Sequence, residues 1–559
     1  MRLQKSHFWQ VFILLIALIV VNIIAYSFYA RFDLTADNRY TLSPASENII
    51  ALADAPVIVD VFLEGEFPPE FRKLQTETRQ LLEEFSAENP QLSFRFTNPL
   101  EEGGNANEIA TQFYEMGMTP ARINVVENGR TSEAIVFPWA MANYGNRSVA
   151  IPLLKNQLGA TTEDRVAASV QQLEYAFADA FSKLLQPKRK KIAVMRGNGE
   201  LEDRYIADFI RSIQEYYFIA PFTLDSVAEN PQQTLAQLKE YDLLIEAKPT
   251  EPYTEAEKLV LDQYLMNGGK QLWLIEHAAM ETDSLFSSAG SAFALPRDLN
   301  LADYFFKYGI RINPALVKDL YSAPIVLATG GGNNTEFNPF PWFYFPLSSS
   351  PSKHPVVNNL EAVKFEYASP MDTLDNAVKK SVLLATSPRS AIEGLPREIS
   401  LEQITSKPDP AEFTAGEQPL AVLLEGEFSS VYENRILPFE LRDFRSKSEP
   451  TRMLVVSDGD VVKNQLQRGE PLELGFDRFT GTTYGNREFM LNAVNYLLDD
   501  TGLINIRSKE VRIAFLDLEK VEENRGFWQV MNILIPLLLL AGFAGGFNAF
   551  RKRKYTSNQ

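Results

Sequence analysis

KIAVMRGNGE, residues 191–200, decides the fold that we expect for the central part of this 559-residue chain. Its apolar run is typical of a buried strand, and the glycines that follow predict a loop before a helix. Two further strands are predicted in YDLLIEAKP (241–249) and KQLWLIE (270–276). Thr254 and Glu257 form a capping box for the helix between them. Strands that alternate with helices predict an α/β fold with a parallel sheet.

The loop after the first of these strands is the candidate ligand site. Ligands of parallel α/β sheets bind beyond the carboxyl ends of the strands, where this loop lies. Its residues are Arg196, Gly197, Asn198, Gly199 and Glu200. The glycines would let a ligand approach the backbone, a following helix N-terminus would favour an anionic or hydroxyl-rich group, and Arg196 could donate paired hydrogen bonds. A tight strand-to-helix turn that binds nothing is the alternative interpretation.

A second α/β region precedes this one. VIVDVFLE (57–64) and LSFRFTNP (92–99) are predicted strands, each followed by a helix. A hairpin with Asn128 and Gly129 at its turn comes next. Strand, helix, strand, helix and hairpin is a thioredoxin-like order, so residues 31–160 are expected to form a thioredoxin-like domain. Because the chain has no cysteine, thiol–disulfide chemistry is excluded.

Both terminal regions carry long apolar runs without formal charge. Residues 8–29 and 527–550 are each long enough to cross a bilayer as a helix. A cleaved signal peptide is the alternative for the first run, but its apolar region would be shorter. In the second run, Gly542 and Gly546 are candidates for close packing against a partner helix. Small residues placed there by chance are the alternative.

The basic residues beside these runs predict the topology. Arg2 and Lys5 precede the first run, and RKRK (551–554) follows the second. Positive residues mark the cytoplasmic side of a membrane segment. Both termini are therefore expected in the cytoplasm, with residues 31–525 outside.

Composition excludes several classes of function. A net charge of −18 argues against a nucleic-acid partner. The three histidines show no spacing typical of zinc ligands, and the sequence has no phosphate-binding loop. The acidic pair at 458–460 (DGD) is interpreted as a solvated turn, and the aromatic run PFPWFYFP (339–346) as core or interface. We therefore predict no catalytic residue, no metal site and no cofactor.

The expected domain organisation follows from these segments. It comprises an N-terminal transmembrane anchor (1–30), the thioredoxin-like domain (31–160), a bridging helix (161–190), a parallel-sheet α/β domain (191–500), a return segment (501–526), and a C-terminal transmembrane helix with a basic tail (527–559).

RFDLT with YTLS after the first anchor, FLEGEFPPEFRKL, and IAVMRGNGE after a bridging helix resemble the GldG family. Members of this family are gliding-motility-associated auxiliary components of ABC transporters in Bacteroidetes-type bacteria, and the family is labelled substrate-binding. The resemblance implies an inner-membrane protein with a large periplasmic domain and with separate permease and ATPase subunits as partners. It also implies that the second domain is similar in fold to class I glutamine amidotransferases, without their cysteine nucleophile.

Two functions are compatible with this resemblance. In the first, the periplasmic body binds a ligand, such as a saccharide or an envelope component, and presents it to the transporter. In the second, it is a structural coupler that passes ATPase-driven motion to partners in the cell envelope. Neither requires the chain to be an enzyme.

Overall fold

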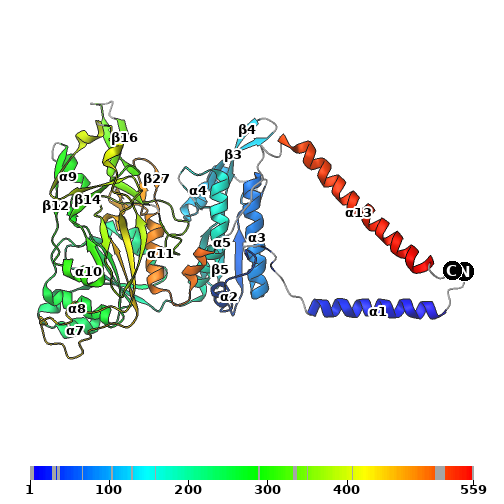
Figure 1. The fold of residues 1–559 in the computed structure, drawn as a ribbon, viewed down its shortest axis with the longest axis horizontal. Helices are drawn as coiled ribbons and strands as arrows, with labels where there is room; N and C mark the ends of the chain where they lie inside the picture. The colour runs from blue at the N-terminus through cyan, green and yellow to red at the C-terminus, as the bar shows by residue number, and fades with distance from the viewer. Residues whose placement is uncertain are drawn as a thin grey trace. The chain divides into compact units, whose positions relative to one another are not determined.

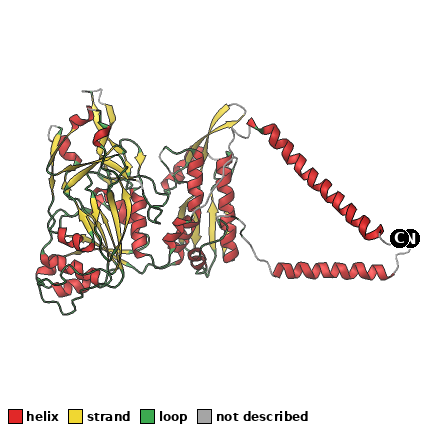
Figure 2. Ribbon diagram, viewed as in Figure 1, coloured by secondary structure: helices red, strands yellow, loops and turns green. Residues whose placement is uncertain are grey.

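The computed structural model describes residues 5–27, 33, 35, 38–65, 67–101, 105–127, 130–155, 157, 159–287, 290–330, 336–348, 350–405, 407–509 and 523–556. The chain divides into two compact units, Met1–Val511 and Arg512–Gln559. Figure 1 traces the order of the elements, and Figure 2 shows that the strands of the first unit are flanked by helices. Its sheets contain parallel strands, which confirms the α/β class.

A four-stranded sheet forms the first part of this unit. Its strands are β1 (Val57–Val61), β2 (Leu92–Phe96), β5 (Trp139–Tyr144) and β6 (Arg147–Pro152), in the order β2-β1-β5-β6. β1 and β2 are parallel, and β5 and β6 are antiparallel to their neighbours. The first two strands confirm the prediction from their apolar runs.

The first part of this unit contains two hairpins, one of which was predicted. The predicted hairpin exists as β3 (Ala121–Glu127) and β4 (Arg130–Val136), and among the described residues these two strands form a sheet of their own. Its turn, Asn128 and Gly129, lies outside the described residues. β5 and β6 complete the sheet instead, joined by a turn with Gly145 in the left-handed region at φ 58°. The predicted hairpin is therefore present, and the β5–β6 hairpin that completes the sheet was not predicted from the sequence.

Four helices accompany this sheet: α2 (Pro44–Ile50), α3 (Pro69–Glu88), α4 (Ala106–Glu115) and α5 (Thr162–Leu185). The hydroxyl of Ser43 accepts a hydrogen bond from the first turn of α2, as an N-cap residue does. α5 packs along α2 and α3 and buries one side against them. It is the longest helix in this part of the chain and leads directly to the second sheet.

The second sheet has seven strands, in the order β19-β22-β23-β10-β9-β7-β8. Their bounds are β7 (Lys191–Arg196), β8 (Phe218–Thr223), β9 (Leu243–Ala247), β10 (Lys270–Leu274), β19 (Lys379–Ala385), β22 (Pro419–Gly426) and β23 (Thr451–Val456). The five strands from β8 to β23 are parallel to one another. β22 is antiparallel to β23, and β19 is antiparallel to β22. The chain passes from β7 to β8 on one side and returns to β9 on the other. The strand order therefore reverses between β7 and β9, where such sheets leave a crevice for ligands.

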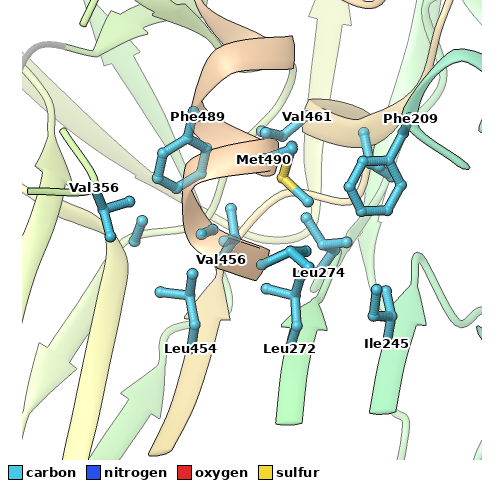
Figure 3. Close-up of a cluster of buried hydrophobic side chains, with 14 of the residues drawn as sticks. Phe209, Ile245, Leu272, Leu274, Val356, Leu454, Val456, Val461, Phe489 and Met490 are labelled. Carbon is cyan, nitrogen blue, oxygen red and sulfur yellow. The ribbon is translucent and has the colours of Figure 1, made fainter. Parts of the chain in front are cut away.

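Helices cover both faces of the second sheet. α6 (Ala207–Gln214) and α11 (Asn486–Leu498) cover one face, and α7 (Pro231–Leu238), α8 (Glu255–Met266) and α10 (Ala302–Tyr308) cover the other. Figure 3 shows Phe489 and Met490 of α11 against side chains of β10 and β23. The predicted capping box of α8 is present, with both reciprocal hydrogen bonds. A short 3-10 turn, η1 (Asp203–Tyr205), separates the loop after β7 from α6.

Smaller elements fill the region between β10 and β23 and the stretch after it. They are β11 (Ala278–Ala279), α9 (Thr282–Ser287), β12 (Ser291–Pro296), β13 (Ile310–Ile312), β14 (Ala315–Asp319), β15 (Ser322–Thr329), β16 (Glu336–Ser348), β17 (Val363–Lys364), β18 (Met371–Thr373), β20 (Ser390–Gly394), β21 (Arg397–Ser400), β24 (Leu466–Gln467), β25 (Glu470–Pro471), β26 (Phe476–Asp477) and β27 (Thr482–Thr483). The 3-10 turns are η2 (Asp225–Ala228), η4 (Leu401–Thr405), η5 (Pro410–Glu412), η6 (Asp460–Val462) and η7 (Leu503–Ser508).

The aromatic run at 339–346 lies on β16. Trp342, Tyr344 and Phe345 are buried in a separate apolar core with residues of β11, β14 and β21. This confirms that these aromatic side chains belong to the core.

The second unit is the helix α13 (Arg525–Thr556). Within the described residues, Arg525–Arg553 is the one helix long and apolar enough to cross a membrane. α1 (Lys5–Ser27) is also helical, but its apolar stretch Phe12–Asn22 is shorter. One helix could therefore anchor the protein in a membrane, and the second predicted span stays a prediction.

Candidate functional site

Charged side chains gather at the carboxyl ends of three neighbouring strands of the second sheet. Lys248 directly follows β9, Glu276 follows β10, and Asp458 and Asp460 follow β23. We call the group the Lys248 cluster; its members are Lys248, Glu276, Glu281, Arg297, Asp458, Asp460 and Lys463. Parallel strands deliver their carboxyl ends to one edge of the sheet, which brings these residues together.

Lys248 lies at the centre of the cluster and is 2% exposed. Its Nζ is 2.8 and 2.9 Å from the two carboxylate oxygens of Asp460, 2.6 Å from Glu281 Oε1 and 3.4 Å from Glu276 Oε2. Its backbone has a φ of 59°, which side-chain-bearing residues rarely adopt. Gly459 packs so closely that an added Cβ would overlap the Lys248 side chain. A strained residue held by buried ion pairs is a common mark of a functional position.

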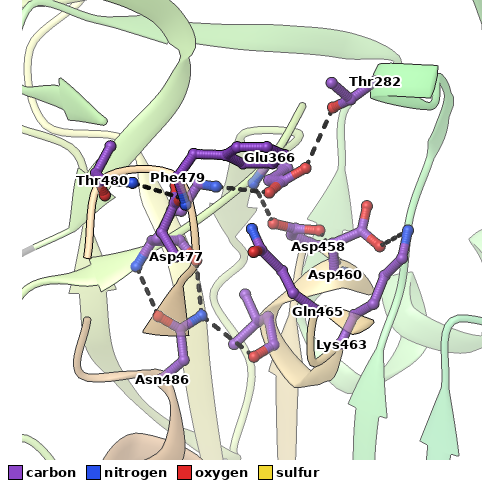
Figure 4. Close-up of polar contacts among 12 residues, drawn as sticks. Thr282, Glu366, Asp458, Asp460, Lys463, Gln465, Asp477, Phe479, Thr480 and Asn486 are labelled. Atoms are coloured by element: carbon purple, nitrogen blue, oxygen red, sulfur yellow. Dashed lines mark hydrogen bonds and ion pairs between the residues drawn. The ribbon is translucent and has the colours of Figure 1, made fainter. Parts of the chain in front are cut away.

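Further cations complete the charge balance. Lys463 Nζ lies 3.0 Å from Asp460 Oδ1 and 3.2 Å from Glu281 Oε2, and Figure 4 shows the first of these contacts. Arg297 donates to Glu276 Oε2 over 3.0 Å. Buried charges persist in proteins when they are paired in this way.

The pairing determines the protonation of the cluster. Burial would lower the pKa of Lys248, but Asp460 and Glu276 raise it above its usual value. Burial would raise the pKa of Asp460, yet Lys248 and Lys463 lower it to about 2. Burial, with the charge of Asp460, raises the pKa of Glu276 to about 8. Lys248 and Asp460 are therefore the permanently charged centre of the cluster.

Three of the carboxylates have the spacing of a metal site. Oxygens of Glu276, Asp458 and Asp460 all lie within 4.8 Å of one another. Asp458 accepts a backbone hydrogen bond from Glu366 over 2.6 Å (Figure 4) and a second one from Asp460 over 2.7 Å. Lys248 forms ion pairs with two of these three carboxylates, Glu276 and Asp460.

The prediction that residues 458–460 form a solvated turn was wrong. Asp458 is fully buried, and Asp460 is buried against Lys248. A short acidic turn attracts water only if nothing covers it, and here the backbone of Glu366, distant in sequence, does so. The signal available from sequence was position: Lys248, Glu276 and Asp458 each stand within two residues of the end of an apolar strand.

The five candidate residues of the loop 196–200 lie together beyond β7, at the point where the strand order reverses. Their polar groups are mostly used within the protein. Arg196 forms an ion pair with Asp203 and donates to the Met195 carbonyl over 2.7 Å. Asn198 N donates to Glu200 Oε2 over 3.0 Å.

Backbone hydrogen bonds join the same loop to the segment after β9. The Asn198 carbonyl accepts hydrogen bonds from the backbone N–H groups of Thr250 and Glu251, each 2.9 Å long. Gly197 and Gly199 have φ values of 117° and 74°, so both need glycine. The loop therefore closes over the end of β9.

An acidic pair lies beneath this loop, and sequence analysis found only half of it. Glu246 of β9 is 0% exposed. Both of its oxygens, Glu200 Oε1 and the Tyr253 hydroxyl lack a hydrogen-bond partner among the described residues. Burial raises the pKa of Glu200. Burial, followed by the charge of Glu200, raises the pKa of Glu246 well above its usual value. We call these two residues the Glu200–Glu246 pair.

A third polar group joins two distant parts of the chain on α5. Glu174 Oε1 accepts hydrogen bonds from Ser43 N, at 2.6 Å, and Ser46 Oγ, at 2.9 Å. Its other oxygen lies 2.6 Å from Lys509 Nζ, which also donates to the Thr41 carbonyl over 2.8 Å. The segment that follows α1 (the leading segment, 33–46) and the segment that precedes α13 (the trailing segment, 503–509) therefore meet at Glu174.

The trailing segment also joins α5 to the second sheet. Arg507 is 2% exposed, and it donates to Gln172 of α5 over 3.3 Å and to the Asn358 carbonyl over 3.1 Å. It also lies 2.8 Å from Glu488 of α11, which pairs with Lys155 at 3.1 Å. This buried arginine connects elements of both sheets.

The two glycines predicted for helix packing, Gly542 and Gly546, lie on α13. A Cβ added to either would meet no atom within 4 Å.

Comparison with known proteins places the chain in a family. Residues 189–493, more than half of the chain, match the model of a family described as an ABC-type uncharacterized transport system. Residues 36–143 match a domain of unknown function, DUF7088. No curated protein sequence matches significantly.

One solved structure, the mmIFT52 N-terminal domain, aligns over 56% of this chain and 99% of its own. Its identity is 15% and its TM-score 0.32, values that support no conclusion about function. Membership of the matched family implies a transporter with partners such as a permease and an ATPase. The chain belongs to the auxiliary family of ABC-type uncharacterized transport systems.

Proposed function

We propose that this protein is a non-catalytic periplasmic component of an inner-membrane ABC transporter of the GldG type, associated with gliding motility, and that its body couples motion. The observation that carries this proposal is the junction at Glu174, where the leading and trailing segments are bound to one helix. Movement of either segment is thereby passed to α5. Arg507 and its partners extend the connection from α5 to the second sheet.

The domain types that we propose are supported by strand order. The first sheet has two parallel strands followed by an antiparallel pair, as in a thioredoxin-like domain. The parallel strands of the second sheet support an amidotransferase-like type. Without cysteine, neither could carry the thiol chemistry of its namesake. The purified full chain is expected to show no ATPase, amidase or glycosidase turnover; turnover lost on a point substitution would contradict this.

A two-pass topology with both termini in the cytoplasm is part of the proposal. Alkaline phosphatase, which is active only in the periplasm, should be active when fused after Tyr40 and inactive when fused after Lys554. The reverse pattern would contradict the topology.

Complex formation tests the proposed partners. The full chain, purified in mild detergent, should bring with it a permease and an ATPase subunit. Leu at both Gly542 and Gly546 should reduce permease recovery if α13 packs on a permease helix through these positions. Gly526→Leu, near the start of α13, is a control expected to leave recovery unchanged. Recovery of neither subunit would argue against a role in a transporter.

A second candidate function, binding of a saccharide-like ligand at Arg196–Glu200, is supported by the position of this loop where the strand order reverses. Saturable saccharide binding to the full chain, lost in Arg196→Ala and Glu200→Ala, would support it. Absence of binding would favour the coupling function.

A further inference from the structure

The Glu200–Glu246 pair presents several buried acceptors to one another. Both oxygens of Glu246 and one of Glu200 have no hydrogen-bond donor among the described residues. Buried polar atoms in folded proteins almost always have a partner. Two facing carboxyl groups can supply the missing donor themselves if one of them carries a proton.

The groups around Glu246 provide no positive charge. Glu200 faces it from the loop after β7, Tyr253 and Glu257 from the start of α8, and Tyr304 from α10. The two phenols are neutral and the two carboxyls are acidic. No lysine or arginine in the described part of the chain forms an ion pair with either member of the Glu200–Glu246 pair.

Arg196 is the basic group that acts on Glu200, where it favours the ionised form. Its guanidinium is already paired with Asp203, so it does not neutralise the carboxyls beneath the loop. Two ionised carboxylates without a counter-ion, side by side in a buried site, are strongly unfavourable.

We propose that Glu200 and Glu246 hold one shared proton, and that this proton keeps the loop 196–200 closed over the carboxyl end of β9. The direction of both pKa shifts agrees with this assignment. The proton site does not depend on the coupling function proposed above.

Loop opening and proton release are linked by this arrangement. Glu200 belongs to the loop, and its Oε2 accepts the Asn198 N–H within it. If the loop opens at Gly197 and Gly199, Glu200 separates from Glu246 and both carboxyls meet water, where they ionise at neutral pH. A rising pH therefore favours the open loop, and a ligand that requires the open loop would release a proton on binding.

Infrared spectroscopy of the full chain in detergent tests the proton directly. At neutral pH, the difference between the wild type and Glu246→Gln should contain the carbonyl band of one protonated carboxyl group. The amide introduced by Glu246→Gln can donate a hydrogen bond to an ionised Glu200, so we expect the variant to keep the fold. Glu251→Gln, an exposed neighbour, is the control and should leave the band unchanged. An unchanged band in Glu246→Gln would overturn the proposal.

Thiol labelling tests whether the shared proton keeps the loop 196–200 closed. The chain has no cysteine of its own, so a single introduced thiol can be followed. Asn198→Cys places one thiol in the buried loop, and Glu251→Cys places one at an exposed position beside it. The ratio of their labelling rates at one pH cancels the effect of pH on the thiol. This ratio should rise with pH, and in the Glu246→Gln background it should stay low throughout. A rise that survives Glu246→Gln would show that this proton does not hold the loop.

Discussion

Glu246 and Lys248 lie two residues apart in the chain, but they belong to sites of opposite charge balance. These sites are the Glu200–Glu246 pair and the Lys248 cluster. In the cluster, buried carboxylates surround an internal ammonium that Lys463 and Arg297 assist. In the pair, two carboxyls lie together, and no cation of the described part of the chain forms an ion pair with either of them. The difference shows that acids buried at one sheet edge can lie beside an ion pair that stays charged, as Lys248 and Asp460 do, or can form a site that binds a proton without a cation.

The largest effect is expected from removing the internal cation. Lys248→Met leaves Asp460 and Glu281 facing each other without their central partner, and loss of one member of a buried ion pair costs about 3–5 kcal/mol. Denaturant unfolding of the full chain in detergent measures this loss. Lys407→Met, at an exposed position, should change stability by less than about 0.5 kcal/mol. A loss as small for Lys248→Met would remove the distinction between the two sites.

Matched acid-to-amide substitutions compare the sites directly. Asp460→Asn removes a charged partner of two lysines and should cost about 1.5–3 kcal/mol, the contribution of a hydrogen bond to a charged group. Glu246→Gln replaces a carboxyl that shares a proton with Glu200 in our account, and its amide can donate in place of that proton, so stability should change by less than about 1 kcal/mol. Equal losses in unfolding experiments would contradict the assigned charge states.

Gly459 tests how tightly the cluster is packed. Gly459→Ala places a methyl group against the Lys248 side chain, and overpacking of this kind costs about 1–3 kcal/mol. Gly394→Ala is the matched control, since a Cβ there meets nothing within 4 Å. If both substitutions have the same effect on the unfolding midpoint, the close approach of residue 459 is not needed.

The pH dependence of stability should differ between members of one cluster. Glu276 has its pKa raised to about 8, so its proton stabilises the fold fully below the ordinary value of 4.5, and this contribution is lost as pH rises towards 8. Asp460 has its pKa lowered to about 2, so its contribution is present above 3.8 and is lost as pH falls towards 2.

Glu276→Gln should reduce the decline in stability between pH 4.5 and 8, because other carboxyls with raised pKa values remain, and should keep the acid-side loss. Unfolding of both proteins at a series of pH values measures this. A decline of the same size in the variant would show that Glu276 is ionised in the folded protein.

Features set by neighbouring residues were predictable from sequence. The capping box of Thr254 and Glu257, the N-cap Ser43 and the strands around 191–200 depend on local chemistry, and all are present. The apolar run at 527–550 depends on composition alone and forms one helix.

Features set by distant packing were not predictable. Asp458 is buried because the backbone of Glu366 donates to it, and Glu246 is buried because the loop of Glu200 closes over it. A carboxylate in a strand or turn gives no sign in one sequence of what will cover it. From sequence, Glu174 is likewise only a polar position on a long helix. Its contacts with Ser43 and Lys509 come from segments far away in the sequence.

The most direct test of the coupling function is a distance measurement in the assembled transporter. The cysteine-free chain allows spin labels at two exposed positions, Glu83→Cys on α3 and Glu229→Cys after η2. Addition of ATP to the complex with permease and ATPase should change the distance between the labels. In Glu174→Ala and in Lys509→Ala, the distance without ATP should be that of the wild type and the ATP response should be lost. If the distance between the labels in the wild-type complex does not change on addition of ATP but changes on addition of a small ligand, the account is contradicted.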